Sequence, residues 1–353
     1  MGKGREIYGD MYDNYTEPIF VGIPSFLKLP VIRSLEALKK EKPDIAVIGA
    51  PLDTATTIRP GTRYGPRAIR AASTVPSPPY QHFNIETGVD PFDTFKVVDT
   101  GDVIISPGDT IGSHKAIESR VRDISALSIC PFVLGGDHSI TYPCVKGWAE
   151  ARNYKKIGLI HFDCHADTGD VGLCGFKYDH GAHIRRIYDL GILKGENYTL
   201  IGPRGFWPGP ETYKWMRDVG MKWYTSFDVY ELGSKAIAED ALERALDGTD
   251  AVWLTFDVDC MDPAFCPGTG EPEPGGLTPR EVFTIIRIIC KNLDVESFGF
   301  DVVEVAPQYD VSDSNSYNGG ITALFANRLC IEVMGGLALK KNGLKEGNPI
   351  RPK

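Results

Sequence analysis

The sequence predicts an α/β protein in which helices cover both faces of a central, largely parallel sheet of about eight strands. Short apolar runs of strand length alternate with longer helical stretches along most of the 353 residues. Neither an internal repeat nor a long linker interrupts this alternation. These observations favour a three-layer α/β/α architecture.

Strands are expected where short apolar runs are rich in β-branched and aromatic residues. Such runs occupy residues 44–49, 95–98, 131–134, 157–162, 198–201, 221–225, 251–256 and 297–303. Helices are expected over longer stretches, of which 108–125 and 140–152 are the most clearly amphipathic. The others are residues 30–40, 211–219, 235–246, 279–291 and 321–339, and a loop rich in Gly, Pro and Arg at 57–70 leads into one more helix.

The composition is that of an ordinary globular protein, with 42% hydrophobic and 24% charged residues. The net charge of −9 argues against a nucleic-acid partner. No apolar run reaches the roughly eighteen residues of a membrane span, and the polar N-terminus lacks the apolar centre of a secretory signal. Eight scattered cysteines favour reduced thiols in a cytoplasmic protein. We expect a polar extension over residues 1–42 and a single domain over residues 43–353.

Metal-ligand side chains follow the apolar run at 157–162. Asp163, His165 and Asp167 stand at alternate positions, so an extended backbone sends all three to the same side. Two carboxylates and an imidazole suit a divalent cation such as Mn, Ni, Co or Zn. Taken alone, the pattern is equally typical of solvated acids at the end of a strand.

The same arrangement recurs twice, which favours the metal interpretation. Asp257 and Asp259 follow the run at 251–256, and His138 follows the run at 131–134 after two glycines. Ligands of open parallel sheets bind beyond the carboxyl ends of the strands. Three strand ends that deliver two His and four Asp therefore predict a site for two metal ions.

Three ordered motifs resemble the ureohydrolases, the family of arginase, agmatinase and guanidinobutyrase. They are GGDHS at 135–139, DCHAD at 163–167 and FDVDCMDPAFCPGTGEPEPGG at 256–276. The likeness continues through residues 22–30, 59–70 and 301–310 and is closest to the agmatinase and guanidinobutyrase branch. The resemblance implies an arginase-like fold, one catalytic domain over 43–353, release of urea and an amine from a guanidino compound, and a trimeric or hexameric assembly.

The resemblance also implies a role for each predicted ligand. Asp163 and Asp257 would bridge two metal ions, His138 and Asp167 would complete the shell of one, and His165 and Asp259 that of the other. Mn²⁺ is the expected metal and Ni²⁺ its alternative, since carboxylate and imidazole ligands suit both. The chemistry agrees, because a resonance-stabilised guanidinium is a poor electrophile and metal coordination lowers the pKa of the attacking water.

The resemblance further assigns Glu304, His180 and Asp167 to catalysis. Glu304 follows the strand at 297–303 and would orient the guanidinium through planar carboxylate pairing. His180 would shuttle a proton to the leaving amine. His183 is a departure from the family pattern that either lines the substrate pocket or caps a helix. His161, inside the strand at 157–162, is expected to be a satisfied core histidine.

Two further departures bear on the substrate. Residues 174–179 lack the Ser and Asn with which arginase-like enzymes recognise an amino-acid head group, so arginine is not the expected substrate. Residues 314–320 lengthen the connection before the last helix, and Tyr317 within them is expected to contact the substrate. This insertion keeps open a nickel-dependent hydrolase of small guanidines or biguanides, either alone or within a hetero-oligomer.

Two other classes compete with the enzyme interpretation. A non-catalytic structural subunit of such a hetero-oligomer would be marked by lost metal ligands, whereas all six are present here. A deacetylase-like hydrolase of related architecture would not predict the GTG segment at 268–270 or VEVAP at 303–307. A small guanidino substrate, with neither nucleic acid nor membrane, is therefore the expected partner.

Overall fold

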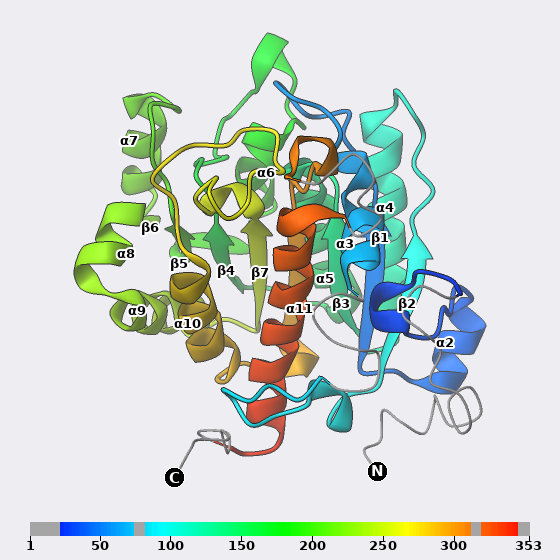
Figure 1. Ribbon diagram of the computed structural model, residues 1–353. Helices are drawn as coiled ribbons and strands as arrows, with labels where there is room; N and C mark the ends of the chain where they lie inside the picture. Colours follow the sequence, from blue (N-terminus) through cyan, green and yellow to red (C-terminus); the bar gives the residue numbers. More distant parts are fainter. Residues whose placement is uncertain (1–21, 74–81, 312–318, 345–353) are drawn as a thin grey trace.

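Eight parallel strands form the middle layer of this computed structural model, which describes residues 22–73, 82–311 and 319–344. They are hydrogen-bonded in the order β2-β1-β3-β8-β7-β4-β5-β6 (Figure 1). The predicted three-layer α/β/α fold is confirmed. The strands are β1 Ile45–Ala50, β2 Val97–Asp102, β3 Cys130–Gly135, β4 Ile157–Phe162, β5 Leu193–Ile201, β6 Lys222–Tyr224, β7 Ala251–Asp257 and β8 Phe298–Val303.

The middle strands are buried along their whole length. Every residue of β1, β3, β4, β7 and β8 is buried, as expected of a parallel sheet covered by helices on both faces. That burial explains why these strands read as continuous apolar runs instead of alternating patterns.

Helices pack on each face of the sheet and enclose two separate cores. One core joins the strands to α3 Gly65–Ala72, α8 Ser226–Leu232, α9 Ser234–Leu246, α10 Pro279–Cys290 and α11 Gly320–Lys341. The other joins them to α2 Leu35–Glu41, α4 Thr110–Ser125, α5 Thr141–Arg152, α6 His183–Asp189 and α7 Pro210–Asp218.

Helix α11 is long and apolar enough to cross a membrane by length and composition, but 83% of that stretch is buried inside the fold. It packs against α10 and α3, as a core helix does. Seven cysteines among the described side chains are free and buried, in agreement with the predicted reduced thiols.

The structure differs from the expected elements at α2, β5, α6 and α8, and β2 ends at Asp102 instead of residue 98. Helix α2 begins at Leu35 instead of residue 30, because Pro30 and Ile32 exchange backbone hydrogen bonds with Asp99 and stay extended. Strand β5 begins five residues before the expected start at 198. Helices α6 and α8 were not expected, because each has only seven residues, too few for a clear helical period.

The strand order and register place four strand ends side by side. Strands β3, β8, β7 and β4 are consecutive in the sheet. Phe162 pairs with Phe256, and Asp257 pairs with Val303. The residues that follow these strands, including Asp163 and Glu304, therefore emerge together at one edge of the sheet, the upper edge in Figure 1.

Candidate metal centre and active-site pocket

His138 is surrounded by three carboxylates. Its Nδ1 atom lies 3.0 Å from Oδ2 of Asp163, 3.1 Å from Oδ2 of Asp257 and 3.3 Å from Oδ2 of Asp167. All four side chains are buried. The four ligands of the predicted first ion, which come from three different strand ends, are thus gathered around one point.

The turn that carries His138 depends on its neighbours in the GGDHS motif. A Cβ atom on Gly136 would lie 1.8 Å from the carbonyl oxygen of Leu52, so only glycine allows this close approach. Asp137 then caps the turn, because its Oδ1 accepts from the backbone N–H of Ser139 at 3.1 Å and its Oδ2 from that of Ala55 at 3.0 Å.

His165 forms the centre of a second group. Its Nδ1 lies 3.1 Å from Oδ2 of Asp259 and 3.5 Å from Oδ1 of Asp163. Asp163 therefore turns one oxygen to His138 and the other to His165, the arrangement of a bridging carboxylate. For Asp257, Oδ2 faces His138 while Oδ1 accepts from the backbone N–H of Asp259 at 2.8 Å.

Cys164 also lies near this second group. Its sulfur lies 3.8 Å from the carbonyl oxygen of Glu271, and burial raises the pKa of its thiol well above the ordinary value in the metal-free protein. The predicted ligands of both groups are imidazole and carboxylate, which suit Mn²⁺ and Ni²⁺ alike.

A buried hydrogen-bond chain fixes the orientation of His138. Its Nε2 lies 2.8 Å from Oγ1 of Thr255, and that hydroxyl donates to Oδ1 of Asp301. Trp253 donates to the other oxygen of Asp301 at 2.7 Å. Because the Thr255 hydroxyl proton is given to Asp301, Nε2–H of His138 is the donor to Thr255 and Nδ1 keeps a lone pair. Such outer partners commonly hold metal-binding histidines in place.

This lone pair is the test of whether the residues fit a metal ion. Nδ1 of His138 is buried and has no hydrogen-bond partner, and it faces three carboxylate oxygens. Without a cation, burial lowers the pKa of His138, but the three surrounding carboxylates outweigh burial and raise it well above its ordinary value, so a proton then occupies the place of the ion at Nδ1. A divalent cation satisfies the lone pair and the carboxylates together, so the residues fit the metal centre.

The pKa values of the carboxylates report the same crowding. Burial and the charges of Asp259 and Asp163 raise the pKa of Asp257 well above its ordinary value. Burial and the charge of Asp163 raise the pKa of Asp167 to about 7. Like charges held this close are stabilised by an added positive charge. Metal binding at this centre is therefore coupled to proton release.

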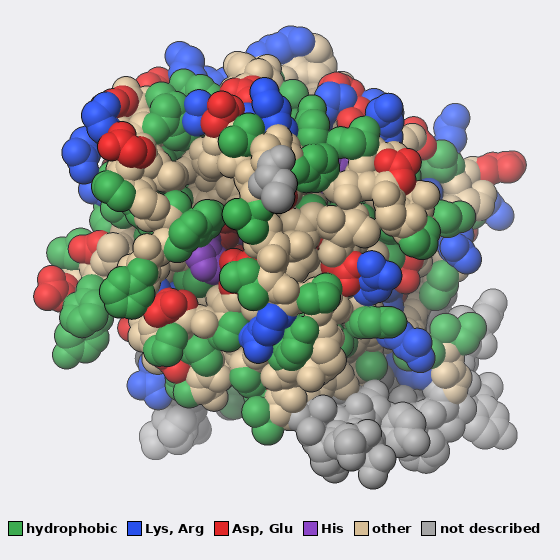
Figure 2. Space-filling model, turned by 90° about the horizontal axis from the view of Figure 1, so that it is seen from above, with side chains coloured by type: hydrophobic (Ala, Val, Ile, Leu, Met, Phe, Trp, Pro, Cys, Tyr) green, Lys and Arg blue, Asp and Glu red, His purple; other side chains and the backbone are tan. Residues whose placement is uncertain are grey.

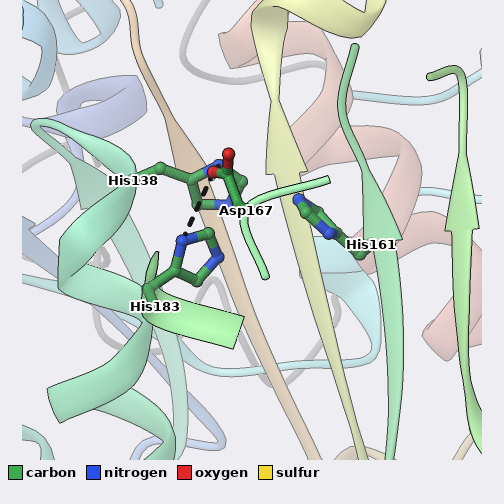
Figure 3. Close-up of side chains that lie close together, drawn as sticks. All are labelled: His138, His161, Asp167 and His183. Atoms are coloured by element: carbon green, nitrogen blue, oxygen red, sulfur yellow. Dashed lines mark ion pairs between the residues drawn. The ribbon is translucent and has the colours of Figure 1, made fainter. Parts of the chain in front are cut away.

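His161 and His183 lie next to the ligands His138 and Asp167 (Figure 3). His161 bonds Tyr198 through Nδ1 and Asp163 through Nε2, each at 2.8 Å, so it is a satisfied core histidine, as predicted, that also orients Asp163. The prediction that His183 lines the substrate pocket is not met. His183 begins α6, is 1% exposed and stacks on His138 with ring centroids 4.0 Å apart, because its Nδ1 bonds the carbonyl of His180 at 2.9 Å.

Two site residues have a left-handed backbone. Asp167 has a φ of 49° and Glu304 a φ of 62°, a conformation that costs energy for residues other than glycine. In Glu304, Oε1 then accepts from the backbone N–H of His138 at 2.8 Å and contacts Nδ1 of His180 at 2.9 Å. Strain of this kind at buried, polar positions is typical of functional sites.

His180 lies between two carboxylates and a threonine. Its Nδ1 contacts Glu304, and its Nε2 lies 2.7 Å from Oγ1 of Thr57 and 3.4 Å from Oε1 of Glu271. Burial lowers the pKa of His180, but Glu304 and then Glu271 outweigh burial and raise it to about 10. The backbone N–H of Thr57, 3.1 Å from Nε2, favours the neutral ring. The bonds from a protonated ring to the carboxylates of Glu304 and Glu271 are charge-assisted and therefore stronger than the bond from this N–H. His180 is thus protonated when no substrate is bound.

A cavity of about 690 Å³ opens above these residues. Its floor includes Asp167, His180 and Glu304, and its mouth is bordered by the apolar side chains of Val171, Leu173 and Trp207. Figure 2 shows a hollow at this end of the molecule, where a histidine is visible between hydrophobic and acidic side chains. Tyr317, which was predicted to contact the substrate, lies outside the described residues.

Sequence reasoning missed Glu271 and Thr57. Both line the cavity, and Thr57 donates from Oγ1 to Oε1 of Glu271 at 2.9 Å. The signal for Glu271 was a single ionisable residue within the run Gly268-Thr269-Gly270-Glu271-Pro272. Thr57 gave no signal of its own, because it stands in a loop whose side chains follow no periodic pattern.

The chain resembles known proteins over nearly its whole length. Residues 43–336 match the model of the Arginase family. The sequence is 40% identical over 314 residues to the mitochondrial agmatinase of Gallus gallus, covering 89% of this chain and 85% of that protein. It is 37% identical over 317 residues to a guanidinobutyrase of Pseudomonas aeruginosa, covering 89% and 93%. Among solved structures, proclavaminate amidino hydrolase from Streptomyces clavuligerus superposes with a TM-score of 0.79 at 33% identity, over 92% of this chain and 100% of that one.

Proposed function

This chain belongs to the arginase family, and from that premise we propose that it hydrolyses a positively charged guanidino compound to urea and an amine. The predicted resemblance to the agmatinase and guanidinobutyrase branch is confirmed. The family is one of binuclear divalent-metal hydrolases that cleave guanidino C–N bonds. The substrate, the metal and the role of each residue are our proposals.

One observation carries the proposal. A carboxylate and a histidine in contact, Glu304 and His180, border the same cavity as the two ligand groups around His138 and His165. A cationic substrate, a proton carrier and a metal centre therefore share one enclosed space, as hydrolysis of a guanidinium ion requires.

The reaction converts R–NH–C(NH₂)₂⁺ and water into urea and R–NH₃⁺. The bond from the central carbon to the substituted nitrogen breaks, a C–O bond forms, and both protons of water end on the leaving amine. We assign Glu304 to hold the guanidinium by paired N–H donors. We assign His180 to carry a proton to the leaving nitrogen.

The charge of the substrate favours proton delivery by His180. Glu304 keeps the pKa of His180 high in the free protein. A guanidinium ion bound to Glu304 places a positive charge beside the ring, and a neighbouring like charge lowers the pKa of a histidine. Substrate binding thus prepares His180 to give up its proton.

The ligands proposed for the two ions are His138, His165, Asp163, Asp167, Asp257 and Asp259. Divalent cations bound there would supply a water of lowered pKa and neutralise the carboxylates. We propose Mn²⁺, with Ni²⁺ as the alternative, because both accept imidazole and carboxylate ligands. Oδ2 of Asp167 lies 3.4 Å from Nδ1 of His183 and 3.3 Å from Nδ1 of His138. This carboxylate is therefore held from both sides.

The charges around the cavity favour a substrate without a carboxylate group. Arg59 is the only Arg or Lys among the described lining residues. Its Nε and Nη2 already donate to the carbonyls of Gly270 and Thr269, and its guanidinium stacks on Tyr309. An acidic tail would therefore find several carboxylates and a single arginine, whose Nε and Nη2 are already engaged. An agmatine-like amine is the better candidate, and hydrolysis of small guanidines is the second, favoured by Glu271.

Two further proposals concern the protein as a whole. We propose a trimer or hexamer, to which α8 offers the exposed apolar side chains of Phe227 and Tyr230 on one helix face. We also propose a cytoplasmic location. Light scattering of the purified protein tests the first, and localisation of the tagged chain in its own cells tests the second.

A panel assay tests the function. Purified protein loaded with Mn²⁺ or Ni²⁺ is incubated with agmatine, 4-guanidinobutyrate, guanidine, methylguanidine and biguanides, and urea and amine are measured. We expect urea from a cationic member of the panel and little from 4-guanidinobutyrate. Absence of turnover for every compound with either metal would instead favour a non-catalytic subunit.

A further inference from the structure

Glu271 is an acidic side chain of the cavity with no assigned role. It stands on the loop after β7, and its side chain is 16% exposed. Its Oε1 accepts from Thr57 and lies 3.4 Å from Nε2 of His180, while its Oε2 lies 3.8 Å from Nε2 of His165. Glu271 and Glu304 therefore face opposite ring nitrogens of the same histidine.

The loop that presents Glu271 is held on both sides by arginines. Arg59 donates to the carbonyls of Thr269 and Gly270, just before Glu271. Arg204 donates to the carbonyl of Glu273, just after it, and to that of Asp259. Backbone carbonyls bound in this way fix the course of the loop, so the carboxylate of Glu271 is held in place before any ligand enters.

The charge of Glu271 has no permanent cationic partner, because the imidazolium of His180 gives up its proton in the proposed reaction. Within the described ranges its ion-pair partners are His165 and His180, and neither Lys nor Arg is among them. His165 turns its other nitrogen toward Asp259, as a metal ligand would. A largely buried carboxylate costs free energy unless a cation pairs with it. A cation that enters the cavity would supply that pairing.

We propose that Glu271 is a second substrate-binding carboxylate, which together with Glu304 holds the guanidinium ion at two of its edges. A guanidinium is planar, and each edge presents two parallel N–H bonds that match a carboxylate. Glu304 meets one edge through Oε2, because its Oε1 is engaged by His138 and His180, and Glu271 meets the next. This assignment rests on the proposed function, since it concerns the substrate of the same site.

The arrangement restricts the substrate. A guanidinium with one substituent keeps two edges that each carry two N–H bonds, whereas a second substituent removes a donor from at least one of them. The pair of carboxylates therefore selects guanidine or singly substituted guanidines, in agreement with the cationic substrate proposed above. A compound such as 1,1-dimethylguanidine loses the second pairing, and with it the contribution of Glu271.

The test compares Glu271→Gln with the wild type in the metal-loaded, full-length protein. Glutamine keeps the size of the side chain and removes its charge. We expect the affinity for guanidinium to fall about tenfold, while the affinity for urea, a neutral molecule of the same shape, stays unchanged. Calorimetric titration with guanidinium chloride and with urea measures both. Glu273→Gln, which removes another carboxylate charge from the cavity lining but none that faces His180, is the matched control and should weaken guanidinium binding far less than Glu271→Gln.

Substrate preference gives a second measurement. In the wild type, kcat/KM should be about tenfold higher for methylguanidine than for 1,1-dimethylguanidine. In Glu271→Gln the two kcat/KM values should become nearly equal, and we call their ratio the gap. The proposal is overturned if the variant keeps both the gap and the guanidinium affinity, if it weakens guanidinium and urea equally, or if it loses bound metal. If the wild type hydrolyses none of these compounds yet Glu271→Gln selectively weakens guanidinium binding, the proposed function fails and the assignment of Glu271 stands.

Discussion

Oε1 of Glu304 contacts Nδ1 of His180 at 2.9 Å and accepts from the backbone N–H of His138 at 2.8 Å. One carboxylate oxygen thus joins the proposed proton carrier to the turn that holds a proposed metal ligand. Among the hydrogen bonds of the described residues, none uses Oε2 of Glu304, so that atom is left to face the cavity.

Glu304→Gln should separate substrate binding from metal binding. The amide keeps an oxygen for the N–H of His138 but loses the charge that pairs with a guanidinium ion. We expect kcat/KM to fall about a hundredfold, with metal content unchanged. Steady-state urea release and metal analysis of the same preparation check both. Activity within about threefold of the wild type would remove Glu304 from the substrate role.

His180→Ala should remove proton delivery and allow chemical rescue. We expect kcat to fall by about a hundredfold or more, because the leaving amine loses its proton donor. Added imidazole, which fits the space left by the ring, should restore part of the rate. Rates measured over a series of imidazole concentrations check this. A variant that is equally slow at every concentration, or as fast as the wild type without imidazole, would contradict the assignment.

Thr255→Val should weaken metal binding without touching a ligand. Valine cannot accept the Nε2–H of His138 or donate to Asp301, so the ligand loses its fixed orientation. We expect the dissociation constant of the metal centre to rise about 10- to 100-fold. Competition with a chelator measures it. Thr249→Val, whose hydroxyl bonds only the carbonyl of Ala245 in its own turn, is the control and should bind metal normally.

Glu332 on α11 should contribute stability that depends on pH. Burial raises its pKa, but hydrogen bonds and charge from Arg287 and then Arg328 outweigh burial and lower it. A folded-state pKa below the unfolded value of about 4.3 means that the stability is present above that pH and is lost as the pH falls further. We expect Glu332→Gln to lower the free energy of unfolding by about 2 kcal/mol at pH 7, with a smaller difference near pH 3.

Urea unfolding at both pH values measures the Glu332 effect. Glu296→Gln is the matched control, because Glu296 and its partner Lys341 are 55% and 46% exposed, and exposed pairs contribute less than about 1 kcal/mol. An equal effect of Glu332→Gln at both pH values would show that the ion pairs with Arg287 and Arg328 are not its cause.

The sequence indicated which side chains leave the strand ends but not which strands are neighbours. The alternation of Asp163, His165 and Asp167 follows from the period of an extended chain, and the six predicted ligands do converge. The adjacency of β4 and β7, which are far apart in the chain, depends on packing across the whole sheet. For the same reason the hydrogen bonds from His138 to Thr255 and from Thr255 to Asp301 could not be predicted from the sequence. They depend on the register between β7 and β8.

Loop residues were the least predictable part of the site. Glu271 lies in a Gly- and Pro-rich loop without a period, and its course is set by hydrogen bonds from Arg59 and Arg204 to backbone carbonyls. His183 was expected at the pocket or at a helix end, and the helix end was right, because a seven-residue helix places its ring behind His138.

The number of metal ions bound at full activity tests the central claim most directly. Metal-free protein is titrated with Mn²⁺, and in parallel with Ni²⁺, while bound metal and urea release are measured on the same samples. Asp163 faces both His138 and His165, and this geometry predicts two ions per chain, with activity rising to its maximum only as the second ion binds. Full activity with one ion or fewer per chain would contradict the two-metal account.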